Sequence, residues 1–240
     1  MVLEKVDHFA ESGAYQRPFE IDRKRPAAIQ VYEDLRARIV SIDLEPGASL
    51  SRPALADYYG VSQTPVRDAL KLLEEEQLIE VYPQSKTLVS KINVEQSRET
   101  QFLRTAFEIE VARTLAARTD KTCLNDAREA IRWQRVVLET EETLVLFRQL
   151  DFRFHAALSE AAGQANLWRL IASRCGHIDR LRNLHLPDAG KTAKVVADHE
   201  RILAAVEASD MDGAAEAVRL HLSDTLSNVA AIAQKYPVYF

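Results

Sequence analysis

The chain has few cysteines, no long hydrophobic run and no excess of positive charge. Its two cysteines, Cys123 and Cys175, stand far from any CxxC spacing, so we expect reduced thiols rather than a disulfide or a zinc pair. No apolar segment approaches the roughly 18 residues of a membrane-spanning helix. The first residues lack the apolar core of a signal peptide. These absences predict a cytoplasmic protein without membrane contact.

The charge balance argues mildly against a nucleic-acid-binding domain. The net charge is −5, and residues 26–92 contain seven Lys or Arg residues against ten Asp or Glu residues. Nucleic-acid-binding domains are usually basic, so any positive surface in this region must be local. The length of 240 residues suits one large or two small domains with buried cores.

Residues 60–70 have the pattern of a tight turn that runs into an amphipathic helix. Gly60 permits the left-handed conformation that ends a preceding helix, Ser62 suits the N-cap, and Pro65 falls in the first turn. The apolar residues from Val66 onward form one buried stripe, whereas the open side carries Gln63, Thr64, Arg67 and Lys71. A helix-turn-helix presents its second helix to the DNA major groove in this way.

The flanking sequence predicts the rest of a small domain over residues 26–92, after a flexible arm at 1–25. We expect helices at about 27–42, 52–59 and 64–76, followed by strands at 78–82 and 87–92 that form a wing. The motif positions, in order, are Leu44-Glu45-Pro46-Gly47, Leu55-Ala56, Gly60-Val61-Ser62, Thr64-Pro65-Val66-Arg67 and Leu78-Ile79-Glu80-Val81.

In order and spacing this pattern resembles the winged helix-turn-helix of GntR-family transcription regulators. The alternative is an amphipathic helix pair inside another kind of helical protein. The resemblance implies that double-stranded DNA is contacted by Arg52, Ser62, Gln63, Thr64, Arg67 and Lys86. Lys86 stands where the family commonly has Gly, and Gln63 where it often has Arg. These departures suggest an altered base preference, since Gln pairs with adenine and Arg favours guanine.

From about residue 93 to residue 240 the sequence has few glycines, no strand pattern and long helical periods. We expect helices near 94–118, 120–140, 142–162, 166–185, 191–209 and 211–235. Consecutive helices without a repeat predict an antiparallel bundle. The predicted fold is therefore mainly α, with a winged helix-turn-helix followed by an all-α bundle.

Three histidines and an aspartate of the predicted bundle form a candidate metal site. Asp151 and His155 are four residues apart and share one helix face. His199 and His221 lie on two later helices. Side chains from facing helices can surround one ion in a bundle core, and this donor set suits Zn²⁺, Ni²⁺ or another divalent ion. Each histidine alone is more often a satisfied core residue than a ligand.

Residues 96–235 resemble the FCD (FadR C-terminal domain) ligand-sensing bundle. The resemblance rests on Phe152–Leu158, on Asn166-Leu167 and on the two later histidines. The resemblance implies that Asp151, His155, His199 and His221 bind a metal, most readily zinc, that holds a small carboxylate effector. Arg104 matches a pocket arginine of the family and can pair with Glu108. Weaker candidates for effector binding are His177 and Arg180, which could equally be a buried polar group and a surface charge.

Three functions are compatible with these patterns. The favoured one is a homodimeric repressor that binds a palindromic operator and releases it when a small organic acid binds. A DNA-binding protein whose bundle only dimerises around a structural metal is the second. The third is a metal-dependent hydrolase fused to a winged helix. No general base, nucleophilic triad or Gly-rich phosphate loop accompanies the histidines, so we expect no enzyme.

Overall fold

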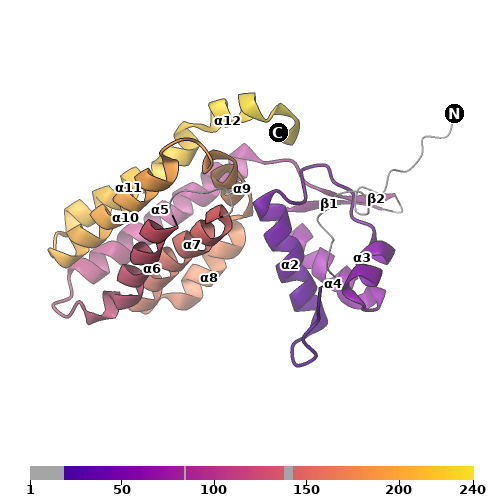
Figure 1. The fold of residues 1–240 in the computed structure, drawn as a ribbon, viewed down its shortest axis with the longest axis horizontal. Coiled ribbons are helices and arrows are strands. Elements are labelled where there is room, and N and C mark those ends of the chain that lie inside the picture. The colour runs from indigo at the N-terminus through magenta and orange to yellow at the C-terminus, as the bar shows by residue number, and fades with distance from the viewer. Residues whose placement is uncertain (1–18, 84, 138–142) are drawn as a thin grey trace. The chain divides into compact units, whose positions relative to one another are not determined.

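The structure is a computed structural model that describes residues 19–83, 85–137 and 143–240, and the chain forms two compact units (Figure 1). Unit 1 contains the described residues up to Asn93 together with Ala233–Phe240, and unit 2 contains Val94–Ile232. Most of the predicted arm and one residue of the wing turn, Gln84, lie outside the described residues. No helix among the described residues is long and apolar enough to cross a bilayer.

In its described residues before Asn93, unit 1 has three helices and a two-stranded wing. Its elements are α2 (Ala27–Ser41), α3 (Arg52–Tyr59), α4 (Gln63–Glu75), β1 (Ile79–Tyr82) and β2 (Lys86–Val89). The strands are antiparallel, with Ile79 opposite Val89 and Tyr82 opposite Lys86. The apolar stripes of the three helices and the inner face of the wing close one core, in which the fully buried residues include Leu35, Leu55, Val66 and Leu73.

The turn between α3 and α4 has the predicted conformation. Gly60 is left-handed, with φ of 61°, and its N–H bonds to the carbonyls that end α3. Ser51 caps the start of α3 by accepting a hydrogen bond from the Ala54 N–H. Ser62 occupies the predicted N-cap position of α4 with an extended backbone, but its side chain makes no cap hydrogen bond. Its hydroxyl is therefore exposed at the start of α4.

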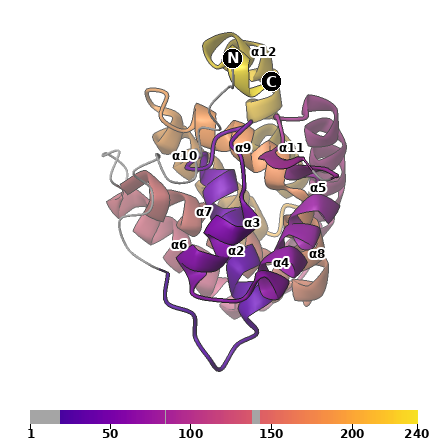
Figure 2. The ribbon, with the colours of Figure 1, turned by 90° about the vertical axis from the view of Figure 1, so that its right-hand side faces the viewer.

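Unit 2 is a helical bundle. Its elements are α5 (Val94–Ala116), η2 (Thr122–Leu124), α6 (Asn125–Val136), α7 (Leu144–Ala161), α8 (Ala165–Arg174), α9 (Gly176–His185), α10 (Lys191–Glu207), α11 (Met211–Ser227) and the start of α12 (Val229–Lys235). Helix α11 packs along both α5 and α10 (Figures 1 and 2). The bundle core is rich in Ala, Val and Leu.

Two predicted helices are each divided in the structure. The helix expected at 166–185 breaks at Cys175, where Gly176, a poor helix former, follows. The helix expected at 211–235 breaks at Asn228, whose side chain donates to the Asp224 carbonyl and so competes with the helical backbone. The helix expected at 120–140 starts only at Asn125, after the short η2 turn, and residues 138–140 lie outside the described part.

The C-terminal segment belongs to unit 1, although the sequence analysis placed residues 93–240 together in the helical domain. After α12 the chain forms a short 3-10 turn, η4 (Pro237–Tyr239). The Ile92 N–H donates to the Tyr239 carbonyl at 2.8 Å, and Lys91 Nζ donates to the Phe240 carbonyl at 2.7 Å. These bonds join the last residues to the segment that follows the wing.

Candidate functional site

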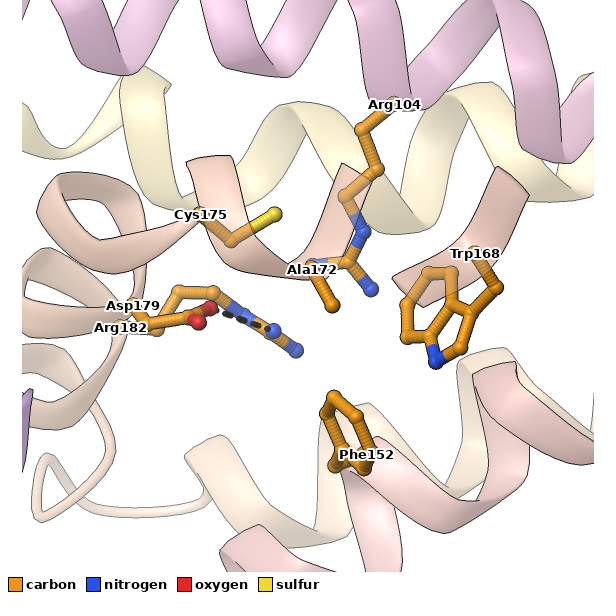
Figure 3. A pocket seen from close by; sticks show the side chains of 7 residues that line it. All are labelled: Arg104, Phe152, Trp168, Ala172, Cys175, Asp179 and Arg182. Atoms are coloured by element: carbon orange, nitrogen blue, oxygen red, sulfur yellow. Dashed lines mark hydrogen bonds and ion pairs between the residues drawn. The ribbon is translucent and has the colours of Figure 1, made fainter. Parts of the chain in front are cut away.

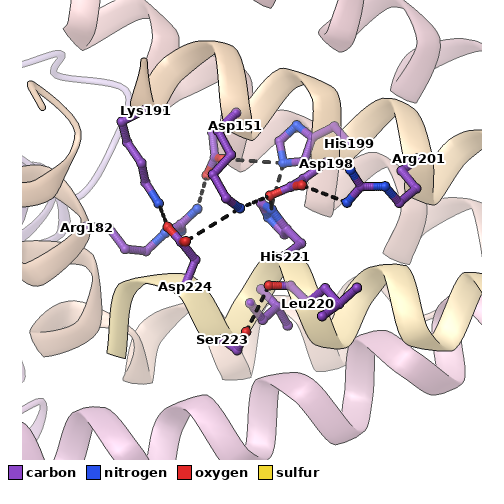
Figure 4. A network of polar contacts seen from close by, with 12 residues as sticks. Asp151, Arg182, Lys191, Asp198, His199, Arg201, Leu220, His221, Ser223 and Asp224 are labelled. Carbon is purple, nitrogen blue, oxygen red and sulfur yellow. Dashed lines mark hydrogen bonds and ion pairs between the residues drawn. The ribbon is translucent and has the colours of Figure 1, made fainter. Parts of the chain in front are cut away.

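The four predicted metal ligands come together in the core of unit 2. Asp151 and His155 lie on α7, His199 on α10 and His221 on α11, and all four side chains are buried. One ligand atom from each lies within 4.8 Å of the other three. His221 Nε2 is 3.3 Å from the Nε2 atoms of both His155 and His199, and His199 Nε2 is 3.5 Å from Asp151 Oδ1. Figure 4 shows Asp151, His199 and His221 converging from separate helices.

The outer nitrogens of the three imidazoles face polar side chains, and those of His155 and His199 are hydrogen-bonded. His155 Nδ1–H donates to Glu108 Oε2 at 2.7 Å, and His199 Nδ1–H donates to Gln134 Oε1 at 2.9 Å. His221 Nδ1 faces Asp198 Oδ2 at 3.7 Å. Since a neutral imidazole carries one proton, a donor at Nδ1 leaves a lone pair at Nε2. Glu108 and Gln134 thereby direct two lone pairs to the common centre, as the outer partners of metal-binding histidines do.

The electrostatics keep His199 and His221 neutral and Asp151 charged. Burial lowers the pKa of His221 to about 4 and holds the pKa of His199 well below 6.5. Burial alone would raise the pKa of Asp151, but the charge of the Arg182 guanidinium holds it well below its usual range. Neutral imidazole and carboxylate are the protonation states that bind a metal.

The donor set and spacing fit a divalent ion. For metal–nitrogen bonds of about 2.1 Å, neighbouring ligands of a tetrahedral site are about 3.4 Å apart. The three short separations between ligand atoms, 3.3, 3.3 and 3.5 Å, agree with this value. Lone pairs that face one another in a buried space repel unless a proton or a cation lies between them, so the cluster is suited to hold an ion.

A small cavity lies beside the cluster, and Arg104 is in its wall (Figure 3). Its volume is about 10 Å³, room for one water, so a larger ligand requires lining side chains such as the half-exposed Phe152 to move. Arg104 is buried, donates through Nε to Glu108 and lies over the Trp168 ring at 5.6 Å from the ring centre. Arg182 donates to Asp151 at 2.6 Å and reaches Asp179 at 3.4 Å. The remaining lining residues are Phe152, Trp168, Ala172 and Cys175.

The two arginines connect the cavity with the metal cluster. Arg182 shares Asp151 with the cluster, and Arg104 shares Glu108 with His155. Any movement of either guanidinium therefore changes the surroundings of Asp151 or His155.

The other two predicted effector-binding residues do not line this cavity. His177 and Arg180 are buried on α9, and Arg180 Nη2 donates to His177 Nδ1 at 2.7 Å. Burial lowers the pKa of Arg180 to about 10. The cavity takes Asp179 and Arg182 from the same helix, and by helical spacing these residues point to a different face.

The predicted DNA-contacting side chains are all exposed on unit 1. Arg52 begins α3, and Ser62, Gln63, Thr64 and Arg67 surround the first turn of α4. Arg67 lies 3.4 Å from Asp68, and both side chains are more than half exposed, so this ion pair contributes little free energy to holding it in place. Lys86 begins β2, with its ammonium 5.2 Å from the centre of the Tyr82 ring.

Several residues of the site were missed by the sequence analysis. Gln134 could have been found, because it is a polar residue in the apolar stripe of α6 with Ala127, Ala130 and Ile131. Asp198 and Arg182 gave no such signal, since charged residues are common on helices. Trp168 also gave none, because an aromatic residue on a helix usually indicates a core position.

Unit 1 has the fold of a DNA-binding domain, and unit 2 adds a helical bundle with a buried Asp–His₃ cluster that could hold a metal ion. Residues 27–89 match the gntR family of bacterial regulatory proteins, and residues 99–224 match the FCD domain. The chain belongs to the GntR family and carries an FCD domain, as its motifs predicted.

Similar proteins are also transcription regulators. An HTH-type transcriptional regulator in an unstable DNA locus of Streptomyces ambofaciens is 36% identical over 88% of both chains. The HTH-type transcriptional repressor RspR of Escherichia coli is 29% identical over 92% of this chain and 96% of its own. The solved structure of E. coli McbR/YncC, 23% identical, has the same fold, with a TM-score of 0.69 over 88% of this chain and 98% of its own. The chain is thus a regulator and not an enzyme.

Proposed function

We propose that the protein is a repressor whose affinity for DNA is lowered by a small carboxylate bound at the metal site of unit 2. The observation that carries this proposal is the connection between the Asp–His₃ cluster and the Arg104 cavity through Arg182 and Glu108. A divalent ion and two guanidinium groups in one buried region attract an anion. The description of RspR as a repressor supports the direction of control.

Zinc is the metal we favour, because three imidazoles and one carboxylate are ligands it commonly takes; nickel suits the same donors. A homodimer would place two α4 helices on the halves of a palindromic operator, about one helical turn apart. An effector that binds the DNA-incompetent arrangement more tightly shifts the population away from DNA. Such a protein acts where the chromosome lies, in the cytoplasm.

A binding experiment tests the proposal. Operators are first selected from random duplexes with metal-loaded protein, and DNA affinity is then titrated in the presence of a panel of carboxylic acids. We expect at least one acid to weaken DNA binding, and we expect chelation to abolish that effect while DNA binding persists. An acid effect that survives chelation would contradict the role of the metal.

A ligand variant separates an effector-holding metal from a structural one. His199→Ala should lose stoichiometric metal and release by the acid, but keep its helix content and DNA binding. His185→Ala is the matched control, because His185 is also a buried helical histidine but lies outside the cluster. If removing the metal from the wild-type protein unfolded unit 2, as measured by circular dichroism, the metal would be structural.

A further inference from the structure

The cavity beside the metal cluster contains a hydrogen-bond donor without a partner. Trp168 is 4% exposed, and its indole Nε1 is buried with no hydrogen-bond partner among the described residues. Its nitrogen edge faces the space between Arg104, Arg182 and Phe152 (Figure 3). A buried N–H that lacks an acceptor destabilises the folded state, so this position needs an explanation.

The cavity presents three donors and little to accept a hydrogen bond. The donors are the two guanidinium groups and the Trp168 N–H. The carboxylate of Asp179 is the lining acceptor, and it already faces Arg182. The Cys175 thiol donates to the Ile171 carbonyl at 3.3 Å, and the remaining lining side chains, Phe152 and Ala172, are apolar. A ligand here must be rich in acceptors and poor in donors.

The charges around the cavity favour a single negative charge. The lining residues and their direct ion-pair partners comprise two arginines, Arg104 and Arg182, and three carboxylates, Glu108, Asp151 and Asp179. The net charge of these five groups is −1, and a divalent ion held by the histidines would change it to +1. One carboxylate neutralises this charge, whereas a dicarboxylate would leave an excess negative charge in a buried site.

We infer that the effector is a compact monocarboxylate with a second, uncharged hydrogen-bond acceptor, and that the Trp168 N–H recognises this acceptor. The inference rests on the proposed function and adds the chemical class of the ligand. The carboxylate lies against the guanidinium groups, and the neutral acceptor, for example a 2-oxo group, accepts from Trp168. A hydroxyl-rich sugar acid brings donors that the cavity cannot satisfy, and a purely alkyl acid leaves the indole N–H unpaired.

Binding of four simple acids to the metal-loaded full-length protein tests the inference by calorimetry. The probes are 2-oxobutanoate, butanoate without the oxo group, the dicarboxylate succinate and the polyhydroxy acid gluconate. We expect 2-oxobutanoate to bind more tightly than butanoate by about 10-fold, the usual effect of one hydrogen bond to a buried donor. Succinate and gluconate should bind more weakly than 2-oxobutanoate.

A conservative variant assigns the preference to the indole N–H. Trp168→Phe keeps an aromatic ring under Arg104 but removes the donor, so it should bind the oxo acid and butanoate equally. Butanoate affinity itself should change by less than about 2-fold, because butanoate makes no bond to the indole. Leu170→Phe is the control, since Leu170 lies on the same helix with its side chain 60% exposed.

The outcomes distinguish this inference from the proposed function. Tighter binding of succinate or gluconate, or an undiminished oxo preference in Trp168→Phe, would overturn the inference and leave a carboxylate-responsive regulator intact. If none of the four acids bound and no acid in the wider panel released DNA, both would fail. The comparison of the four acids on the wild-type protein decides the ligand class even if Trp168→Phe does not fold.

Discussion

Glu108 is predicted to support both the stability of unit 2 and its metal affinity. It is buried on α5 and pairs with the guanidinium of Arg104 and with His155 Nδ1. Glu108→Gln keeps the size and one acceptor but leaves a buried cation without its counter-charge, which typically costs about 3–5 kcal/mol. We expect a loss near 3 kcal/mol, because the glutamine oxygen still accepts one hydrogen bond. Metal affinity should fall by about 10- to 100-fold, as for other outer-shell carboxylates.

Two assays with a matched control separate these effects. Urea denaturation of metal-free protein measures the free energy of unfolding, and competition with a chromophoric chelator measures metal affinity. Glu110→Gln is the control, because Glu110 lies on the same helix but is exposed, and it should change neither quantity appreciably. If Glu108→Gln bound metal as tightly as the wild type, the hydrogen bond to His155 would not orient that ligand, and our reasoning about the outer partners would be wrong.

Four further predictions concern other parts of the chain. Gln63→Arg should change which base is preferred at one position of each half-site, because a bidentate contact discriminates between bases by about 1–3 kcal/mol of binding free energy. If both proteins selected identical sites from random duplexes, Gln63 would make no base contact. Lys86→Gln should weaken specific and random DNA alike and flatten the salt dependence, measured by titration at several salt concentrations; an unchanged slope would mean that Lys86 meets no phosphate. Burial would raise the pKa of Asp224, but the ammonium of Lys191 beside it (Figure 4) and that of Lys194 outweigh this effect and lower the pKa, so Asp224 stabilises the fold above about pH 4 and ceases to do so as the pH falls. Asp224→Asn should therefore reduce the urea midpoint at pH 7, and the difference should shrink below about pH 4; a difference that does not vary with pH would contradict this linkage. Removing residues 236–240 should raise hydrogen exchange at the Ile92 amide without changing metal affinity; unchanged protection would show that the tail does not hold this segment.

The fold was predictable where local chemistry determines it. Gly60, the exposed Gln63–Arg67 face and the alternating strands each follow from short-range patterns, and the structure has the expected helix, turn and wing. The breaks at Cys175 and Asn228 were not predicted. Each depends on a single residue whose local effect is small compared with the helical periodicity on both sides.

The geometry of the candidate metal site was predictable in part. The four-residue spacing of Asp151 and His155 places them on one helix face without further information. That His199 and His221 join them depends on how α10 and α11 pack, which the family resemblance supplied and periodicity did not. The cavity could not be predicted without the three-dimensional structure, because its unpaired indole N–H and the carboxylates that it shares with the cluster come from residues far apart in the chain.

The C-terminal segment gives the two units a second covalent connection, in addition to the one between β2 and α5. The chain passes between the units at Asn93–Val94 and again at Ile232–Ala233. In unit 1 the segments at these points are bonded to each other, through Ile92 with Tyr239 and through Lys91 with the Phe240 carbonyl. Burial and a hydrogen bond to Glu45 raise the pKa of Tyr239 to about 12, so its hydroxyl stays protonated and can donate to Glu45.

In unit 2 the same two connections lead to helices that carry the site. The connection at Asn93–Val94 leads into α5, which carries Arg104 and Glu108. The connection at Ile232–Ala233 follows α11, which carries His221. We therefore expect a change at the Asp–His₃ cluster that shifts α11 against α5 to act on both connections, whose ends in unit 1 are held together by hydrogen bonds. A tail deletion that leaves metal and DNA affinity unchanged but reduces the effect of acid on DNA binding would locate the coupling in this paired segment. An undiminished acid effect would require another route.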